Sequence, residues 1–173
     1  MRRLVVAAIG VLAVASCAVA SCAVASSGGE QTAPTPIVDR IDEAIEAVEQ
    51  HYGSPQQYFE ISATIGEVSL IVAVDDATAA EQGGFTDDGG FTVPEPVGPA
   101  DGSTFAAEAI GFDSDRIFEQ IRVELNDPVI IDFAIQGTRG GTVLYDATVA
   151  SDAGGVLLVL LGPEGQILGA QAR

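Results

Sequence analysis

Hydrophobic residues recur every three or four positions along two stretches of the chain, and this spacing predicts two amphipathic helices. The first helix begins at Thr35-Pro36, with Thr35 as N-cap and Pro36 in the first helical position, and it ends at Gly53. Asp113 or Ser114 caps the second helix, and the segment Asn126-Asp127-Pro128 stops it. The apolar positions are Ile37, Ile41, Ala44, Ile45, Val48 and Tyr52 in the first helix and Ile117, Phe118, Ile121 and Leu125 in the second.

Apolar and polar residues alternate with a period of two after each helix, which predicts β-strands. The first pair of strands lies on either side of Gly66, and the second pair lies on either side of a turn at 137–141. A third pair, 155–161 and 166–172, is joined by the turn at 162–165, where Pro163 presets the backbone angle. The predicted inward positions of the first two pairs are Phe59, Ile61, Ala63, Ile65, Val68, Leu70, Val72, Val74, Val129, Ile131, Phe133, Ile135, Val143, Tyr145, Ala147 and Val149.

The two halves of the body share the same order of predicted elements, so we interpret the body as two αβββ-type repeats, about 36–97 and about 113–173. Two helices cannot cover two separate small sheets and leave either stable. We therefore expect an α+β fold, with one antiparallel sheet of about six or seven strands and two helices packed on one face. The other face should meet solvent, because its positions are mostly polar: Glu60, Ser62, Thr64, Asp132, Gln136, Asp146 and Thr148.

This order of helix, strand meander and closing turn resembles the PepSY-like and β-lactamase-inhibitor-protein-like group of exported modules. The likeness covers about residues 36–173, and the segment Gly162-Pro163-Glu164-Gly165-Gln166-Ile167-Leu168 is similar to a PepSY sequence signature. The stretch Tyr58-Phe59-Glu60-Ile61-Ser62-Ala63-Thr64 also resembles uncharacterised actinobacterial lipoproteins. The resemblance implies an exported αβ module, and it brings no active-site residues to this chain.

The start of the chain has the pattern of a bacterial export signal. Arg2 and Arg3 precede an apolar stretch over 4–15, which is too short to span a membrane. Cys17 and Cys22 each follow small residues in the repeat Ser-Cys-Ala-Val-Ala, and each copy resembles a lipobox, the site at which a cysteine is lipidated. We therefore predict a lipoprotein-type signal peptide over 1–22.

Ordinary secretion is the alternative, since small residues also surround the bonds after Ala20 and Ala25, and a cut after Ala25 would remove both cysteines. Residues 23–35 are rich in Ser, Gly, Ala, Thr and Pro and predict a flexible tether. Residues 36–173 then form a single αβ domain.

Acidic residues dominate the charge of the chain. It holds 25 acidic residues against seven arginines and no lysine, with a formal net charge of −18. Such a chain is repelled by phosphate backbones and anionic headgroups, so we expect no nucleic-acid partner and no electrostatic membrane docking. Membrane contact should come through the N-terminal lipid anchor alone.

Residue types exclude most catalytic chemistry. His51, the single histidine, lies at the end of the first helix, where a solvated residue or a favourable charge is the usual role. Cysteine is confined to the leader, and the absence of lysine removes phosphate-binding loops and Schiff-base chemistry. We expect no catalytic residue and no cofactor.

The segment from Asp75 to Gly102 is acidic and rich in Gly and Pro, and it predicts a long loop with one short strand over 90–93. Its part over 81–104 is interpreted either as a partner-binding arm, which exposes Phe85, Phe91, Val93 and Val97, or as a poorly ordered crossover. Five acids could offer oxygen ligands to calcium, but their spacing does not fit an EF-hand, so we predict no metal site: Asp75, Asp76, Glu81, Asp87 and Asp88.

These expectations describe an exported, lipid-anchored, non-catalytic binding module on the outer side of the cytoplasmic membrane. It would bind an envelope protein or a small ligand through the open sheet face or the long loop. The alternative is an envelope carrier of apolar ligands, held between helices and sheet in a cavity larger than a few hundred cubic ångströms. The sequence does not predict an oligomeric state.

Overall fold

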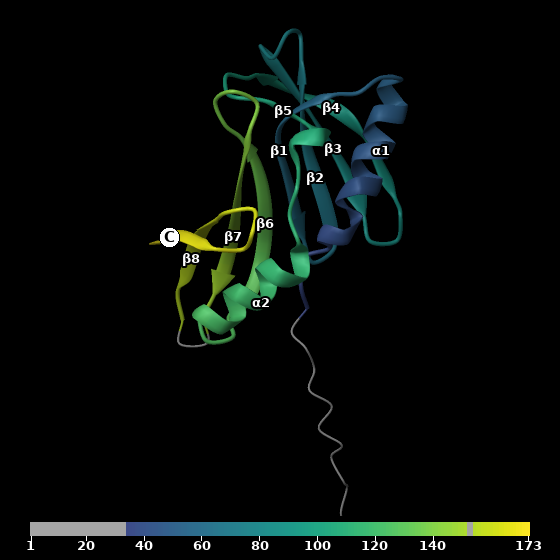
Figure 1. Ribbon diagram of the computed structural model, residues 1–173. Helices are drawn as coiled ribbons and strands as arrows, with labels where there is room; N and C mark the ends of the chain where they lie inside the picture. Colours follow the sequence, from purple (N-terminus) through teal and green to yellow (C-terminus); the bar gives the residue numbers. More distant parts are fainter. Residues whose placement is uncertain (1–33, 152–153) are drawn as a thin grey trace, which may run out of the picture. The chain divides into compact units, whose positions relative to one another are not determined.

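The computed structural model describes residues 34–151 and 154–173, and Figure 1 shows their arrangement. Their strands form one sheet with the order β4-β3-β2-β1-β6-β7-β8-β9, and β5 adds to β1. Neighbouring strands run antiparallel throughout this sheet. The elements are η1 (Val38–Arg40), α1 (Ile41–Tyr52), β1 (Gln57–Thr64), β2 (Glu67–Val74), β3 (Ala79–Thr86), β4 (Phe91–Pro99), β5 (Phe105–Ala106), η2 (Ala107–Ala109), α2 (Ser114–Glu124), β6 (Val129–Gly137), β7 (Val143–Ala150), β8 (Val156–Leu161) and β9 (Ile167–Ala172).

The first helix starts later than predicted. A 3₁₀ turn, η1, precedes it, and the N-cap residue of α1 is Arg40, so the predicted start at Thr35-Pro36 is wrong. The backbone amide of Ile37 donates to the carbonyl of Thr64 (2.8 Å), which ties this part of the chain to the end of β1. The predicted end is confirmed, because Gly53 takes a left-handed conformation and its amide donates to the Glu49 carbonyl.

The second helix, α2, begins as the sequence predicts. Asp113 is the N-cap, and its side chain accepts a hydrogen bond from the amide of Arg116 (3.1 Å). The helix packs closely on the turn between β8 and β9. A Cβ at Gly165 would lie 3.1 Å from the Cα of Ile117, and the backbone of Gly165 has φ of +82°. Glycine is therefore required there both by the backbone conformation and by the space beside α2.

The sheet has nine strands, so the expected six or seven was too few. The difference lies in the segment predicted to be a long loop, which instead forms β3, a turn and β4. Alternation is weak in β3, which contains Gly83-Gly84, and β4 carries prolines at 94, 96 and 99. Proline lacks the amide proton that a central strand needs, and β4 accommodates it by lying at the sheet edge. The prediction that 81–104 forms a loop-like arm is therefore wrong, and Phe85, which was expected to be exposed, is buried.

A β-bulge shifts the predicted alternation in each half of the sheet. In β1 the bulge lies between Tyr58 and Glu60, and in β6 it lies between Ile130 and Asp132. The extra residue changes which side chain faces the core. Tyr58 and Ile130 are buried, whereas the predicted inward residue Ile131 is 38% exposed. The inward assignment of Phe59 is wrong for the same reason, and Ile65 lies beyond the end of β1 and is exposed.

One hydrophobic cluster joins both helices to alternate residues of the strands. Its members include Ile41, Ala44, Ile45 and Val48 of α1, Ile117, Phe118 and Ile121 of α2, and Tyr58, Ile61, Leu70, Phe133, Tyr145 and Val159 of the sheet. The α+β class and the single antiparallel sheet are confirmed. Each half contributes a helix followed by four consecutive strands, and β1 and β6 pair where the halves meet. The αβββ repeat and the packing of both helices on one face remain predictions.

Candidate functional site

The predicted lipidation sites, Cys17 and Cys22, lie outside the described residues, as does most of the predicted tether. Within the described part of the chain, neither helix has the length and apolar character needed to cross a membrane.

His51 makes ring contacts at the end of α1. Its ring lies edge-on to that of Tyr52, with centroids 5.1 Å apart, and 6.2 Å from that of Phe91. Both neighbours pack on the hydrophobic core. These contacts fit a side chain that covers the end of the helix.

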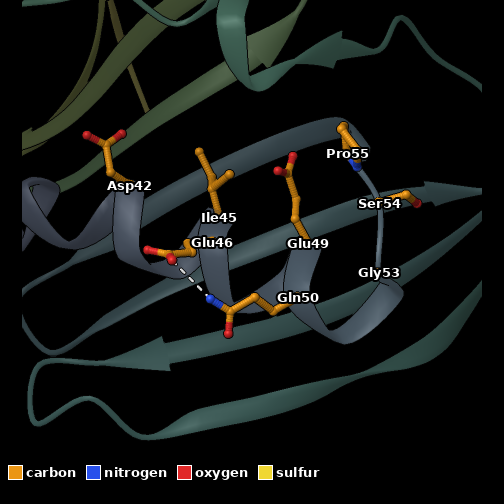
Figure 2. A pocket seen from close by; sticks show the side chains of 8 residues that line it. All are labelled: Asp42, Ile45, Glu46, Glu49, Gln50, Gly53, Ser54 and Pro55. Atoms are coloured by element: carbon orange, nitrogen blue, oxygen red, sulfur yellow. Dashed lines mark hydrogen bonds between the residues drawn. The ribbon is translucent and has the colours of Figure 1, made fainter.

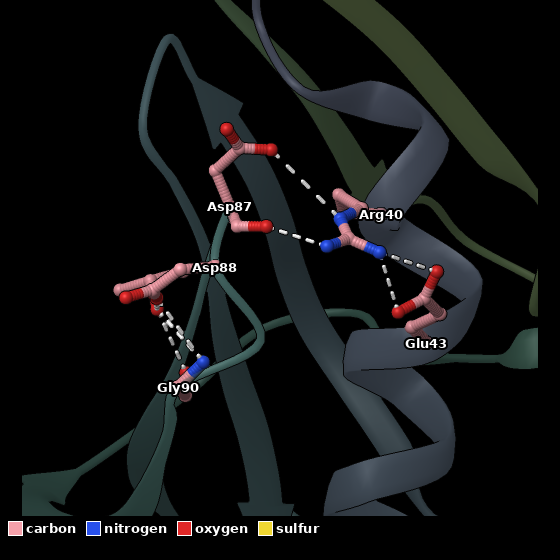
Figure 3. Close-up of polar contacts among 6 residues, drawn as sticks. Arg40, Glu43, Asp87, Asp88 and Gly90 are labelled. Carbon is pink, nitrogen blue, oxygen red and sulfur yellow. Dashed lines mark hydrogen bonds and ion pairs between the residues drawn. The ribbon is translucent and has the colours of Figure 1, made fainter.

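The five acids considered as calcium ligands do not meet. Asp75 and Asp76 lie in the turn between β2 and β3, whereas Asp87 and Asp88 lie in the turn between β3 and β4. Figure 3 shows the second turn beside Arg40 of η1. The Arg40 side chain donates a hydrogen bond to the Asp87 carbonyl and also forms an ion pair with Glu43 (2.7 Å).

Hydrogen bonds to nearby residues occupy the carboxylates of two of these acids, Asp88 and Glu81. Asp88 accepts hydrogen bonds from the Thr86 hydroxyl and the Gly90 amide, and these bonds hold the pKa of Asp88 below its usual range. Glu81 in β3 accepts a hydrogen bond from the Tyr52 hydroxyl. Burial, and then the Glu81 carboxylate, raise the pKa of Tyr52. These acids stabilise turns and the contact of α1 with the sheet.

A hollow of about 490 Å³ runs along the surface of α1 (Figure 2). Its lining includes the carboxylates of Asp42, Glu46 and Glu49, and Gln50 donates a hydrogen bond to Glu46 (2.9 Å). Among the lining residues Ile45 is the one large aliphatic side chain. All of the lining residues lie in α1 or directly after it, so the hollow is not a cavity between helices and sheet and gives no support to the carrier hypothesis.

A ring of polar side chains surrounds Ala134 on the side of the sheet opposite the core, which we call the open face. Ala134 pairs with Ser62 of β1 and Asp146 of β7. Asp132 and Gln136 lie two residues away along β6 and therefore on the same face. Glu60 pairs with Gln136 and lies diagonal to Ala134. The ring thus consists of Glu60, Ser62, Asp132, Gln136 and Asp146.

Asp146 is the one charged residue that is buried within 34–151 and 154–173, and 5% of its surface is exposed. Its carboxylate has no hydrogen bond to any residue within 34–151 and 154–173. In these residues every fully buried side-chain oxygen has a hydrogen-bond partner. Because the Asp146 carboxylate oxygens have none, they are not fully buried and retain some contact with solvent. Burial, followed by Asp132 and Glu60, raises the pKa of Asp146 to about 6.

The other two acids of the ring are half-buried. Burial raises the pKa of Glu60, and the charge of Asp132 adds to this. Burial also raises the pKa of Asp132, against the opposing effect of Arg173. Gln136 donates to Glu60 (3.4 Å), and Arg173, which follows β9, is the cation that acts on Asp132 and Asp146. Arg173 therefore acts on two of the three carboxylates.

A groove of about 360 Å³ begins at the ring, because Glu60 and Gln136 belong to its lining. Residues 100–103, in the segment that connects β4 to β5, form one wall, and Phe59 and Ile71 contribute apolar surface. The segment lies tight against the end of β6, since a Cβ at Gly137 would come within 2.3 Å of the Ser103 carbonyl oxygen. The groove therefore has one wall fixed by close backbone packing.

The sequence assigned the ring residues to the open face but did not predict that three acids would surround one small residue. Sequence separation hides this grouping, because Glu60 and Asp146 are brought near each other by the pairing of β1 with β6 and of β6 with β7. One signal was available. Asp146 interrupts the apolar run of Val143–Ala150 without a basic residue beside it.

Comparison with known proteins gives one structural neighbour. No family model matches the chain, and no curated protein matches it. The crystal structure of a candidate lipoprotein from Clostridium difficile 630 aligns with a TM-score of 0.47 and 10% sequence identity, covering 83% of this chain and 97% of that one. The resemblance to PepSY-like modules and to actinobacterial lipoproteins remains a prediction.

Proposed function

We propose that the chain is an exported, lipid-anchored, non-catalytic module of the cell envelope that binds a protein partner on the open face of its sheet. The observation that carries this proposal is the ring around Ala134, which combines a buried carboxylate with two half-buried ones. Burial of ionised carboxylates is unfavourable, and Arg173 offsets it at Asp132 and Asp146. A basic group of a partner would add a further favourable interaction.

The remaining charge of the chain supports a basic partner. Two of the five arginines outside the leader already form ion pairs, Arg40 with Glu43 and Arg116 with Glu164. A molecule with 25 acidic residues attracts cationic surfaces over a long range and repels acidic ones. The partner should therefore present a basic patch to the open face.

Mass spectrometry of the mature N-terminus tests the anchor. We expect the protein purified from membranes to begin at a cysteine, either Cys17 or Cys22, that carries lipid mass. Replacement of both cysteines by serine should release the protein from the membrane fraction, because a soluble αβ domain has no other expected anchor. A mature chain that begins with unmodified Ser26 would contradict the lipid-anchor prediction.

Site-specific photo-cross-linking in cells of the source bacterium tests the binding face. We expect a photoreactive phenylalanine at Ser62, on the open face, to give a discrete adduct with an envelope protein. The same residue at Glu119, an exposed position on α2, should not give this adduct. Mass spectrometry of the adduct should identify a protein with a basic surface. Equal adducts from both positions, or none from Ser62, would count against the proposal.

A further inference from the structure

We propose that the outer edge of β9 pairs with β9 of a second copy of this chain, in antiparallel orientation about a twofold axis. This surface is a sheet edge rather than the open face, so the inference is independent of the proposed function. Strand β9 ends the sheet, and among the described strands β8 is its one neighbour. The backbone groups on its other side are available to a further strand.

The pairing with β8 fixes which backbone groups of β9 point outward. The amide of Arg173, directly after β9, donates to the carbonyl of Val156 in β8 (3.0 Å). In an antiparallel ladder the backbone groups of alternate residues point to opposite neighbours. Ala170 and Ala172 therefore direct their amides and carbonyls away from β8. The outer edge thus presents donors and acceptors at the spacing that another antiparallel strand requires.

The two edges of the sheet differ in their protection against pairing. The other edge strand, β4, contains prolines at 94, 96 and 99, and its pairing with β3 has two register shifts. Prolines and bulges prevent an edge strand from adding to another sheet. Strand β9 has no proline and no charged residue, and its irregular pairing with β8 lies before Gly169. The edge that can accept a strand is therefore β9.

Charge favours a second copy as the strand that pairs with β9. The chain has a formal net charge of −18, so most contacts between two copies would bring acidic side chains together. Strand β9 is uncharged, and its pairing with itself places no like charges directly opposite each other. A basic partner would find no charge to complement on this strand. The neutral strand is thus suited to contact between two acidic molecules.

The side chains of this edge also fit a second copy of themselves. A pair centred on Ala170 places Leu168 of each copy opposite Ala172 of the other, so a large side chain meets a small one. Leu168 is 60% exposed, and Leu160 of β8, which pairs with Gly169, is 36% exposed. A Cβ at Gly169 would have no atom within 4 Å, so the space beside Leu160 is open. Pairing would cover apolar surface in both copies.

The protected edge limits the assembly to two copies. Pairing of β9 with β9 uses the same edge of both molecules and leaves their β4 strands outside. Because the prolines of β4 oppose further pairing, the assembly closes as a dimer. The interface is a short strand, so it should bury less than the about 1,200–2,000 Å² of stable complexes. We expect a dissociation constant on the order of 0.1 mM.

Sedimentation velocity of the full-length protein at 0.15 M salt tests the proposal. A non-ionic detergent prevents association through the apolar leader, and the concentration runs from about one tenth to about ten times the expected dissociation constant. We expect the average mass to rise from that of one copy toward that of two copies and no further. A monomer at every concentration would overturn the proposal, as would growth beyond two copies.

Opposite charges at one position test for pairing between identical strands. Ala170→Glu and Ala170→Lys each place like charges opposite across the twofold axis, so each variant alone should dimerise at least about tenfold more weakly than the wild type. An equal mixture of the two variants should recover the dimer, because glutamate in one copy then faces lysine in the other. Recovery also shows that both variants are folded, and Ala170 is exposed in the monomer.

Val97→Glu is the matched control on the other edge of the sheet. Val97 in β4 is 59% exposed, and this variant should change dimerisation by less than about twofold. Unchanged dimers in both Ala170 variants, or no recovery in their mixture, would overturn the pairing of β9. A dimer weakened more by Val97→Glu than by Ala170→Glu would do the same. The Ser62 adduct is measured on the open face, so its presence or absence is a separate result.

Discussion

Replacement of Phe133 by alanine is expected to lower the free energy of unfolding by about 3–5 kcal/mol. Phe133 is fully buried in β6, in the middle of the sheet. Its ring lies 5.0 Å from that of Phe112, 5.9 Å from that of Phe118 and 6.0 Å from that of Tyr145. One side chain thus connects α2, the segment before it and the strand β7.

The neighbours of Phe133 explain why the cavity should persist. The residues paired with it on both adjacent strands are alanines, Ala63 in β1 and Ala147 in β7. Alanine cannot rotate to fill the space that the phenyl ring leaves, so the loss of contacts should be nearly complete.

Urea denaturation, with the slope compared between variants, measures the effect of Phe133→Ala. The matched control is Val123→Ala on α2, because Val123 is 73% exposed and its truncation should change stability by less than about 0.5 kcal/mol. A loss below about 1 kcal/mol for Phe133→Ala would show that the rings do not form the packed cluster described here.

The stability of the wild-type protein should fall by about 1–3 kcal/mol as pH rises from about 4 to about 6, and Asp146→Asn should remove most of this fall. Burial raises the pKa of Asp146 from its ordinary value of 3.8 to about 6, so the folded state binds the proton more tightly than the unfolded state does. The stabilisation by the protonated form is complete below about pH 4 and is lost as pH passes through about 6. Raised pKa values at Glu60 and Asp132 act in the same direction.

Chemical denaturation at a series of pH values measures this difference. Above pH 6.5 we expect Asp146→Asn to be more stable than the wild type, since asparagine carries no charge to bury. Glu119→Gln is the control, and its pH profile should parallel that of the wild type. A variant Asp146→Asn whose stability follows the wild-type profile at every pH would show that Asp146 ionises without cost.

Local sequence determined the elements that depend on nearby residues. The end of α1 at Gly53 and the capping of α2 by Asp113 were predicted because each is fixed by a few neighbouring residues. Alternation also predicted β2 and β7, with Leu70 and Ala147 facing the core. The placement of Glu60, Asp132 and Asp146 opposite the core followed from the same period of two.

Tertiary structure alone decided what depends on pairing between distant strands. The proline-containing strand β4 is tolerated because it lies at an edge, and local rules cannot tell an edge from a loop. The bulges that bring Tyr58 and Ile130 inward arise from register with partner strands. The ring around Ala134 exists because β1 pairs with β6, which brings together residues about seventy positions apart, and the burial of Asp146 is a property of that pairing rather than of its local sequence.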